Sequence, residues 1–167
     1  MNDQAAWNQA LTTTSGWYFD LPPDSRLELD GLIEEIMQIK QKLVDLVTAS
    51  GSSTICRNCG GMCCLLGKYH FSVLDLLAYR KSGNNPPVPD FTSSPACPYS
   101  DTSGCSMSPR YRPTTCVIFN CQLIEERLTP AERTTFRDLE TKLRDTVAHT
   151  GRVHKIRLDR PLLLSGS

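Results

Sequence analysis

The sequence predicts a mostly α-helical protein, a small cysteine-rich domain with two long packed helices joined by irregular loops. Apolar residues recur at helical spacing over residues 27–48 and 129–150, and each segment has residues that can cap its ends. All eight cysteines lie between these two segments, in a region rich in glycine, proline and serine. A chain of 167 residues is long enough for one domain with a modest core.

The N-terminal segment is polar and contains the pair Pro22-Pro23, so we expect a mostly irregular lead over residues 1–26. The remaining divisions that we predict are a single domain at 27–150 with a cysteine cluster at 55–122, and a C-terminal tail at 151–167 with a short extended segment at 153–158.

The first long helix carries a wide apolar stripe. Its a/d heptad track consists of Leu29, Leu32, Ile36, Ile39, Leu43 and Leu46, widened by Ile33 and Val47. We favour a core helix of a globular domain, because the stripe is wide and the track is short. The alternative is a coiled-coil seam, which would make residues 29–47 the contact with a protein partner or a second copy in a homodimer.

Shorter elements are expected between the long helices. Residues 52–69 read as a glycine-rich turn region. Ser72 followed by Asp75 forms a capping box for a helix over 70–81. Residues 82–96 are rich in proline, glycine, serine and asparagine and predict a surface loop, and a turn or short helix is expected near 117–124.

The second long helix has the strongest start signal in the chain. Thr129 can cap it, Pro130 fits the first helical position and Glu132 completes a capping box, while Gly151 fits its end. Its stripe is formed by Phe136, Leu139, Leu143 and Val147. The two stripes match, so we expect the long helices to pack together and to carry the cysteine region at one end.

The cysteines are the most specific feature of the sequence. They are Cys56, Cys59, Cys63, Cys64, Cys97, Cys105, Cys116 and Cys121. The N-terminus does not resemble a secretory signal and no stretch is apolar enough to span a membrane, so we expect a cytoplasmic protein whose thiols stay reduced. All eight cysteines are therefore candidate metal ligands, and we expect a metal-stabilised domain in which these loops bind zinc or iron.

The spacing leaves the partition of the ligands open. Cys56-Arg57-Asn58-Cys59 can direct two thiolates at one ion, and Gly60 permits the positive φ that such a turn often needs. Adjacent side chains diverge, so Cys63 and Cys64 are expected to serve two different ions or two metals of one cluster. Eight thiols can form two four-cysteine sites, one four-cysteine cluster with spare thiols, or a multinuclear centre, and an iron–sulfur cluster is one of the alternatives.

Other residues near the cysteines have weaker assignments. Cys97 and Cys105 are compatible with a turn that closes onto the metal region, and Cys116 and Cys121 with one turn of helix. Four basic residues are candidates to offset the negative charge of a thiolate site, and these are Arg57, Lys68, Arg110 and Arg112. His70 is a candidate neighbour of the site, although eight sulfurs suffice as ligands without it.

The order of these residues resembles the YkgJ-like cysteine-cluster family, also called CxxCxxCC proteins, which are described as zinc- or iron-chelating domains. The matching motifs are Cys56-Arg57-Asn58-Cys59 with Cys63-Cys64, Cys97-Pro98, Gly104-Cys105, and Arg112-Pro113-Thr114-Thr115-Cys116 continuing to Cys121. The resemblance covers roughly residues 55–122. One spacing differs, since Gly60-Gly61-Met62 places three residues before the double cysteine where the family name implies two. The resemblance implies a ligand set and no particular substrate.

Function classes can be ranked from these observations. Lysine plus arginine and aspartate plus glutamate both number 18, which argues against binding to nucleic acid or to anionic membranes. We expect a metal-binding protein with no assigned catalytic residue. The alternatives are an iron-dependent or iron–sulfur enzyme or electron-transfer protein and, with less support, a thiol–disulfide module using Cys56 and Cys59.

Overall fold

The structure is a computed structural model that describes residues 2–59, 62–65, 67–89, 91, 97–101 and 104–163. It is mostly helical, which confirms the predicted class. In chain order its α-helices, 3-10 helices (η) and strands are α1 (Asp3–Asp20), α2 (Pro23–Ala49), α3 (Ser52–Asn58), η1 (Met62–Cys64), η2 (Gly67–Tyr69), α4 (Val73–Lys81), β1 (Ser100–Asp101), β2 (Gly104–Cys105), η3 (Pro109–Tyr111), α5 (Thr114–Ile118), α6 (Gln122–Glu125) and α7 (Pro130–Val153).

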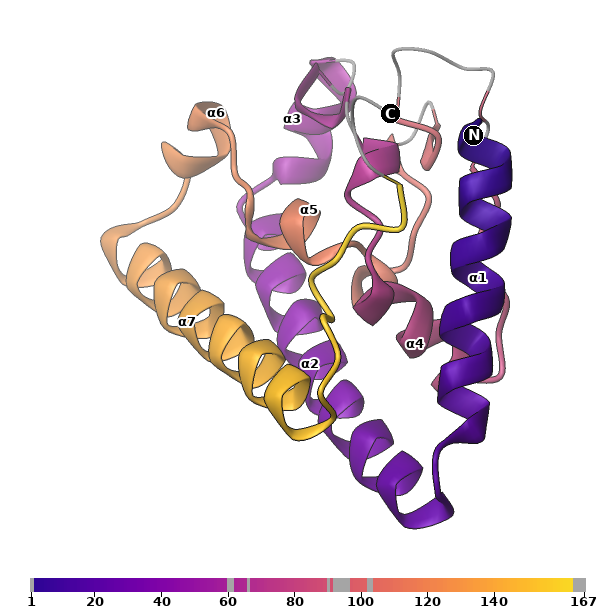
Figure 1. Ribbon diagram of the computed structural model, residues 1–167. Coiled ribbons are helices and arrows are strands. Elements are labelled where there is room, and N and C mark those ends of the chain that lie inside the picture. The colour runs from indigo at the N-terminus through magenta and orange to yellow at the C-terminus, as the bar shows by residue number, and fades with distance from the viewer. Residues whose placement is uncertain are drawn as a thin grey trace.

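The two longest helices, α2 and α7, pack against each other, as their apolar stripes predict (Figure 1). Leu29, Ile36 and Leu43 of α2 and Leu143 of α7 are fully buried. The stripe of α2 is therefore buried within this chain, as we predicted for a core helix of a globular domain. Thr129 and Glu132 form the capping box at the start of α7.

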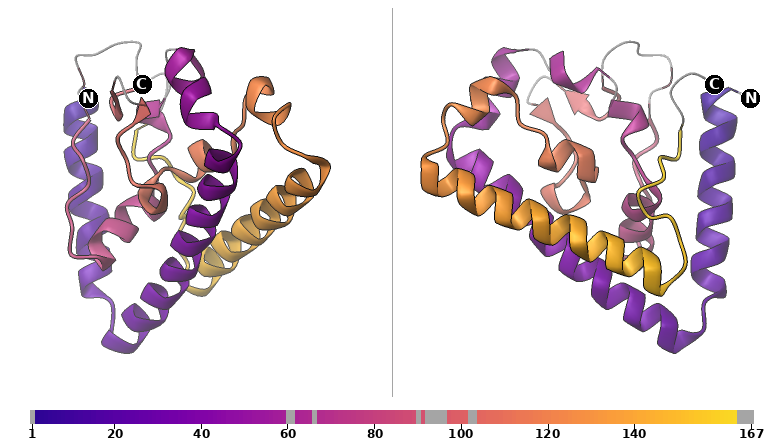
Figure 2. Two further views of the ribbon diagram at one scale, coloured as in Figure 1. Left: turned by 180° about the vertical axis from the view of Figure 1, so that it is seen from behind. Right: turned by 60° about the vertical axis from the view of Figure 1, so that its left-hand side comes forward.

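Residues 1–26 are not an irregular lead, and that prediction is wrong. Asn2 caps helix α1 by accepting a hydrogen bond from the Ala5 N–H at 2.9 Å. The helix buries Trp7 completely, with its ring centroid 5.2 Å from that of Phe71, and it buries most of Tyr18. Ala10, Leu11 and Trp17 pack against the core as well, so the helix presents a narrow apolar stripe among polar residues. The helix lies beside α4 (Figure 2).

Helix α4 forms the centre of the core. Its first six residues, Val73–Ala78, are all buried, and Ser72 and Asp75 make the predicted capping box. The C-terminal tail runs across its start, because Leu74 N–H donates to the Leu158 carbonyl at 3.0 Å and Leu162 N–H to the Phe71 carbonyl at 2.8 Å. The tail therefore contacts this part of the chain over 158–162, with one antiparallel bridge between Ser72 and Pro161. The predicted extended segment at 153–158 is wrong, since Val153 ends α7 and a turn follows.

The cysteine-bearing segments lie at the end of the molecule where α1 begins and α2 ends (Figures 1 and 2). In the predicted surface loop, residues 82–89 and 91 form neither helix nor strand, while residues 90 and 92–96 lie outside the described residues. Among the described helices, none combines the length and the apolarity that crossing a membrane requires.

Candidate metal centre

The Cys-x-x-Cys motif lies on a helix. Cys56 is in α3 and Cys59 is its C-cap residue, whose Sγ donates to the Cys56 carbonyl at 3.4 Å. The predicted glycine-rich turn region at 52–69 is therefore wrong for its first part. The prediction of a positive φ at Gly60 lies outside the described residues. Cys63 and Cys64 follow in η1, and the Cys63 side chain is likewise outside the described part.

Cys97 and Cys105 are brought together by a small hairpin. Strands β1 and β2 pair antiparallel, with Ser100 opposite Cys105, and Ser106 N–H donates to the Tyr99 carbonyl at 2.8 Å. Gly104 has a φ of 118°, which favours glycine at this turn. The predicted turn between the two cysteines is thus confirmed.

Cys97 also approaches η2, the segment that follows Cys64. A Cβ atom added at Gly67 would collide with the Cys97 Sγ and would lie 3.0 Å from the Cys97 Cβ. Glycine at position 67 is therefore needed for the hairpin to reach the segment that carries the double cysteine.

Cys116 lies in α5, where its Sγ is 3.3 Å from Nδ1 of His70. Phe119 has extended backbone after α5, and Cys121 is the N-cap of α6. The prediction that Cys116 and Cys121 share one turn of helix is therefore wrong. Helix α6 instead contacts α3, which carries Cys56.

The electrostatic environment joins four of the cysteines. Burial raises the pKa of the Cys116 thiol, and the nearby Asp75, Cys97, Cys105 and Cys64 raise it further. Burial and then Cys105 raise the pKa of Cys97. The Cys116 residue as a whole is exposed to solvent. The burial that raises its pKa therefore comes from protein atoms packed around the thiol on one side. Thiols from η1, the hairpin and α5 are thus electrostatic neighbours.

A buried ion pair positions the segment before Cys116. Lys40 Nζ lies 2.7 Å from Asp75 Oδ1, and both side chains are almost completely buried. The same ammonium donates to the Arg112 carbonyl at 3.0 Å, while Ser72 Oγ donates to Asp75 Oδ2 at 2.7 Å. Lys40 therefore ties α2 to both α4 and the Arg-Pro-Thr-Thr-Cys segment. The sequence analysis missed this role.

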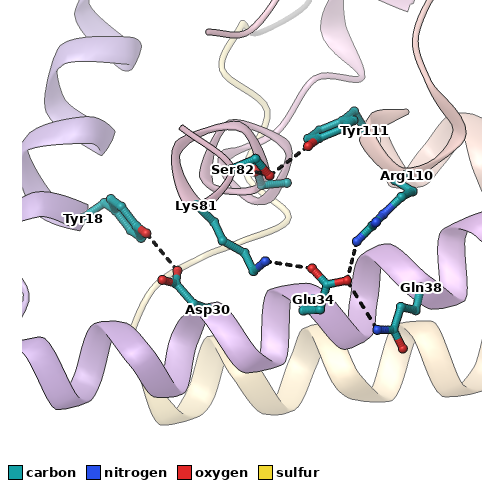
Figure 3. A network of polar contacts seen from close by, with 9 residues as sticks. Tyr18, Asp30, Glu34, Gln38, Lys81, Ser82, Arg110 and Tyr111 are labelled. Carbon is teal, nitrogen blue, oxygen red and sulfur yellow. Dashed lines mark hydrogen bonds and ion pairs between the residues drawn. The ribbon is translucent and has the colours of Figure 1, made fainter. Parts of the chain in front are cut away.

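A second polar network connects the same elements (Figure 3). The carboxylate of Glu34 on α2 accepts from Lys81 of α4 at 2.7 Å and from Gln38 at 3.3 Å, and it pairs with Arg110 of η3. The hydrogen bond from Lys81 lowers the pKa of Glu34. Tyr111, next to Arg110, donates to Ser82 at 2.8 Å. Both networks hold the backbone that leads into α5.

Three of the four basic residues proposed to offset thiolate charge have other contacts. Lys68 pairs with Asp3 at 2.8 Å, Arg110 pairs with Glu34, and Arg112 Nε donates to the Met107 carbonyl at 3.0 Å. Arg57 is exposed in the last turn of α3. Two of these cations thus already balance carboxylates outside the cysteine cluster.

The cysteine-bearing segments lie close to one another. Cys116 contacts His70, and the nearby Cys64, Cys97 and Cys105 raise the pKa of its thiol. Helix α3, with Cys56 and Cys59, contacts both α6, which begins after Cys121, and β2, which contains Cys105. Within the residues that the structure describes, no three histidine, cysteine, aspartate or glutamate side chains are already arranged as a metal-binding group.

Comparison of the chain with models of protein families, with curated protein sequences and with solved structures finds no match.

Proposed function

We propose that this protein binds zinc or iron through its cysteine cluster, in the manner of the cysteine-cluster family that its sequence resembles. The observation that supports the proposal is the approach of cysteine-bearing segments that are distant in sequence. Cys97 lies against Gly67, three residues after Cys64, and the hairpin brings Cys105 back toward Cys97. The nearby Cys64, Cys97 and Cys105 also raise the pKa of Cys116. These four are the ligands that we assign to one site. Cys56, Cys59 and Cys121 remain for a second site where α3 meets α6, and we add Cys63 to this set from the sequence alone, because its side chain lies outside the described residues.

The donor set fits such a metal chemically. Zinc accepts four tetrahedral thiolates, and iron–sulfur clusters also take four cysteines. The raised pKa values of Cys97 and Cys116 indicate that these groups hold protons in the metal-free protein. A bound divalent metal would displace the protons and compensate the thiolate charge. His70, beside Cys116, is placed to contact a ligand sulfur.

The weak packing of this region gives the metal a structural role. Its regular elements are short, and the cysteines are intermediate or exposed in their accessibility. Tyr99, Met107 and Val117 are among its few buried apolar side chains. Metal–sulfur bonds would cross-link segments that apolar contacts hold weakly, so that metal binding contributes to folding.

A thiol–disulfide function has less support. Redox-active Cys-x-x-Cys motifs depend on a helix N-terminus to stabilise the thiolate. Here Cys56 and Cys59 occupy the C-terminal end of α3, where the helix dipole has the opposite sign. The iron-dependent or iron–sulfur enzyme or electron-transfer protein remains the alternative within metal binding.

Elemental analysis of the full chain purified without oxygen tests the proposal. We expect zinc or iron in stoichiometric amount, with Cys97→Ser and Cys116→Ser each lowering it substantially. Ser108→Ala is the matched control, because this exposed residue lies in the same region and makes no side-chain cap. A coloured protein with broad visible absorbance assigns an iron–sulfur centre and a colourless zinc protein removes it. Metal-free protein with eight reactive thiols would contradict the proposal.

A further inference from the structure

A cavity of about 540 Å³ lies between α5, α7 and the C-terminal tail. Its walls are the start of α5, the C-terminal half of α7 and the tail that crosses α4, and these elements contribute Thr114, Thr115, Val147, Arg152 and Leu158. The volume falls within the range of pockets that bind small molecules. None of the functions considered above uses this cavity.

The mouth of the cavity is cationic. Arg144, Arg152 and Arg157 all line it. Arg144 is held by Glu140, with its Nη2 2.8 Å from the Oε1, and Arg157 Nε lies 3.9 Å from Asp159. No carboxylate among the described residues pairs with Arg152. Asp159 also lines the cavity, so three arginines stand against one aspartate in the lining and its net charge is positive, although the whole chain has a net charge of zero.

Two threonines of α5 line the same wall. Thr114 contributes its side chain there, although its Oγ1 is buried away from the open space and, within the described residues, makes no hydrogen bond. Thr115 adds a second hydroxyl to the same wall.

The rest of the lining is mainly apolar. Leu74, Ile118, Val147, Ile156 and Leu158 contribute to it, and Ala148 lies on the wall formed by α7. An apolar interior with guanidinium groups at its mouth is complementary to a molecule that has an apolar body and an anionic end. Arginine forks match the geometry of carboxylates and phosphates.

We propose that this cavity is a binding site for a small amphipathic anion, in which a carboxylate or phosphate contacts Arg152 and Arg157 and an apolar chain fills the interior. This site does not require the metal for its contacts. Its position matters for function, because Thr115 immediately precedes Cys116 and His70 lines the cavity while contacting the Cys116 sulfur. A bound anion would lie beside the cysteine cluster.

Isothermal titration of the protein as purified, with hexanoate and hexyl phosphate, tests this site. We expect saturable binding of at least one anion, and tighter binding of one assigns the headgroup. Hexanol and hexylammonium are the neutral and cationic probes and should bind at least about tenfold more weakly, because a charge-assisted hydrogen bond is lost. Arg152→Gln should weaken anion binding by about tenfold for the same reason.

Two further variants distinguish binding in the cavity from a general attraction of anions to the charged surface. Arg137→Gln is the matched control, since Arg137 is an exposed arginine of α7 that does not line the cavity. Its binding should equal that of the unaltered protein. Ala148→Trp places a large side chain in the cavity without changing charge and should abolish binding. The proposal is overturned by the absence of saturable anion binding, by equal binding of hexanol, or by equal losses in the Arg152 and Arg137 variants.

Discussion

The helical scaffold and the cysteine-bearing end of this protein are held together by different means. Helices α1, α2, α4 and α7 bury a continuous apolar core, with fully buried side chains such as Trp7 and Leu143. The cysteine-bearing end has short elements, among them two-residue strands, and several accessible thiols. Apolar packing therefore accounts for the scaffold, and metal cross-links are our proposal for the cysteine-bearing end, where fewer buried side chains join the core.

Metal removal should produce the largest difference in stability between the two regions. Chelation is expected to unfold the cysteine-bearing end while the scaffold keeps its structure, because structural zinc sites supply binding energies on the order of 10 kcal/mol. Hydrogen exchange of the full chain with and without chelator measures this. Amides of Cys105 and Val117 should lose protection, while those of Leu43 and Leu143 keep it. Equal loss of protection in both regions would contradict the division.

Lys40→Met tests the connection between the two regions. Removing one partner of a buried ion pair leaves Asp75 without its counter-charge and should lower the free energy of unfolding by about 3–5 kcal/mol. The Arg112 carbonyl also loses its donor, so metal content should fall. Urea denaturation and elemental analysis provide the measurements. Lys42→Met, at an exposed position of the same helix, should change stability by less than about 0.5 kcal/mol.

Two glycine substitutions, one in each region, should change the free energy of unfolding in opposite directions. Gly67→Ala introduces a Cβ that collides with the Cys97 sulfur, and this overpacking should cost about 1–3 kcal/mol and reduce metal binding. Gly31→Ala lies in α2 with no neighbouring atom within 4 Å, so it should stabilise the protein by about 0.5–1 kcal/mol and leave metal content unchanged. Urea denaturation distinguishes these signs. Destabilisation by the second variant would contradict the account of α2.

The scaffold alone is tested by Thr129→Ala. The substitution removes the side-chain acceptor for the Glu132 N–H and half of the capping box of α7. A loss of about 1 kcal/mol is expected in urea denaturation. Metal content should stay at the level of the unaltered protein, since α7 carries no cysteine. A fall in metal content would show that the two regions depend on each other more than we infer.

The smallest effect concerns pH and Glu34. The hydrogen bond from Lys81 lowers the pKa of this carboxyl in the folded protein below its ordinary value, 4.5. The resulting stabilisation is therefore complete above the pKa of the unfolded chain and is lost as the pH falls through the folded value. The stability difference between the unaltered protein and Glu34→Gln should shrink between about pH 7 and pH 3. A difference that stays constant would contradict this assignment.

The helices with clear caps and stripes could be predicted from the sequence. Thr129 to Glu132 marks the start of α7, and Ser72 with Asp75 marks that of α4, because capping depends on residues close together in the chain. Helix α1 gave a weaker signal, because Trp7, Leu11 and Tyr18 recur at helical spacing but stand among polar residues. Its stability comes mainly from the tertiary packing of these side chains.

The candidate site was predictable in composition but not in arrangement. The eight cysteines identify the chemistry, yet the approach of Cys97 to Gly67 and of Cys116 to His70 depends on contacts between distant segments. Lys40 did give a local signal, because it follows Ile36 by four residues on the apolar stripe of α2. A lysine at such a position indicates a buried partner, here Asp75.

X-ray absorption at the metal edge, recorded on protein purified without oxygen, shows whether cysteine sulfur coordinates zinc or iron. The account predicts a coordination shell dominated by sulfur, at about 2.3 Å for zinc, that weakens when Cys97 or Cys116 is replaced by serine. A shell made of oxygen and nitrogen alone, or protein that binds no zinc or iron under these conditions, would contradict it.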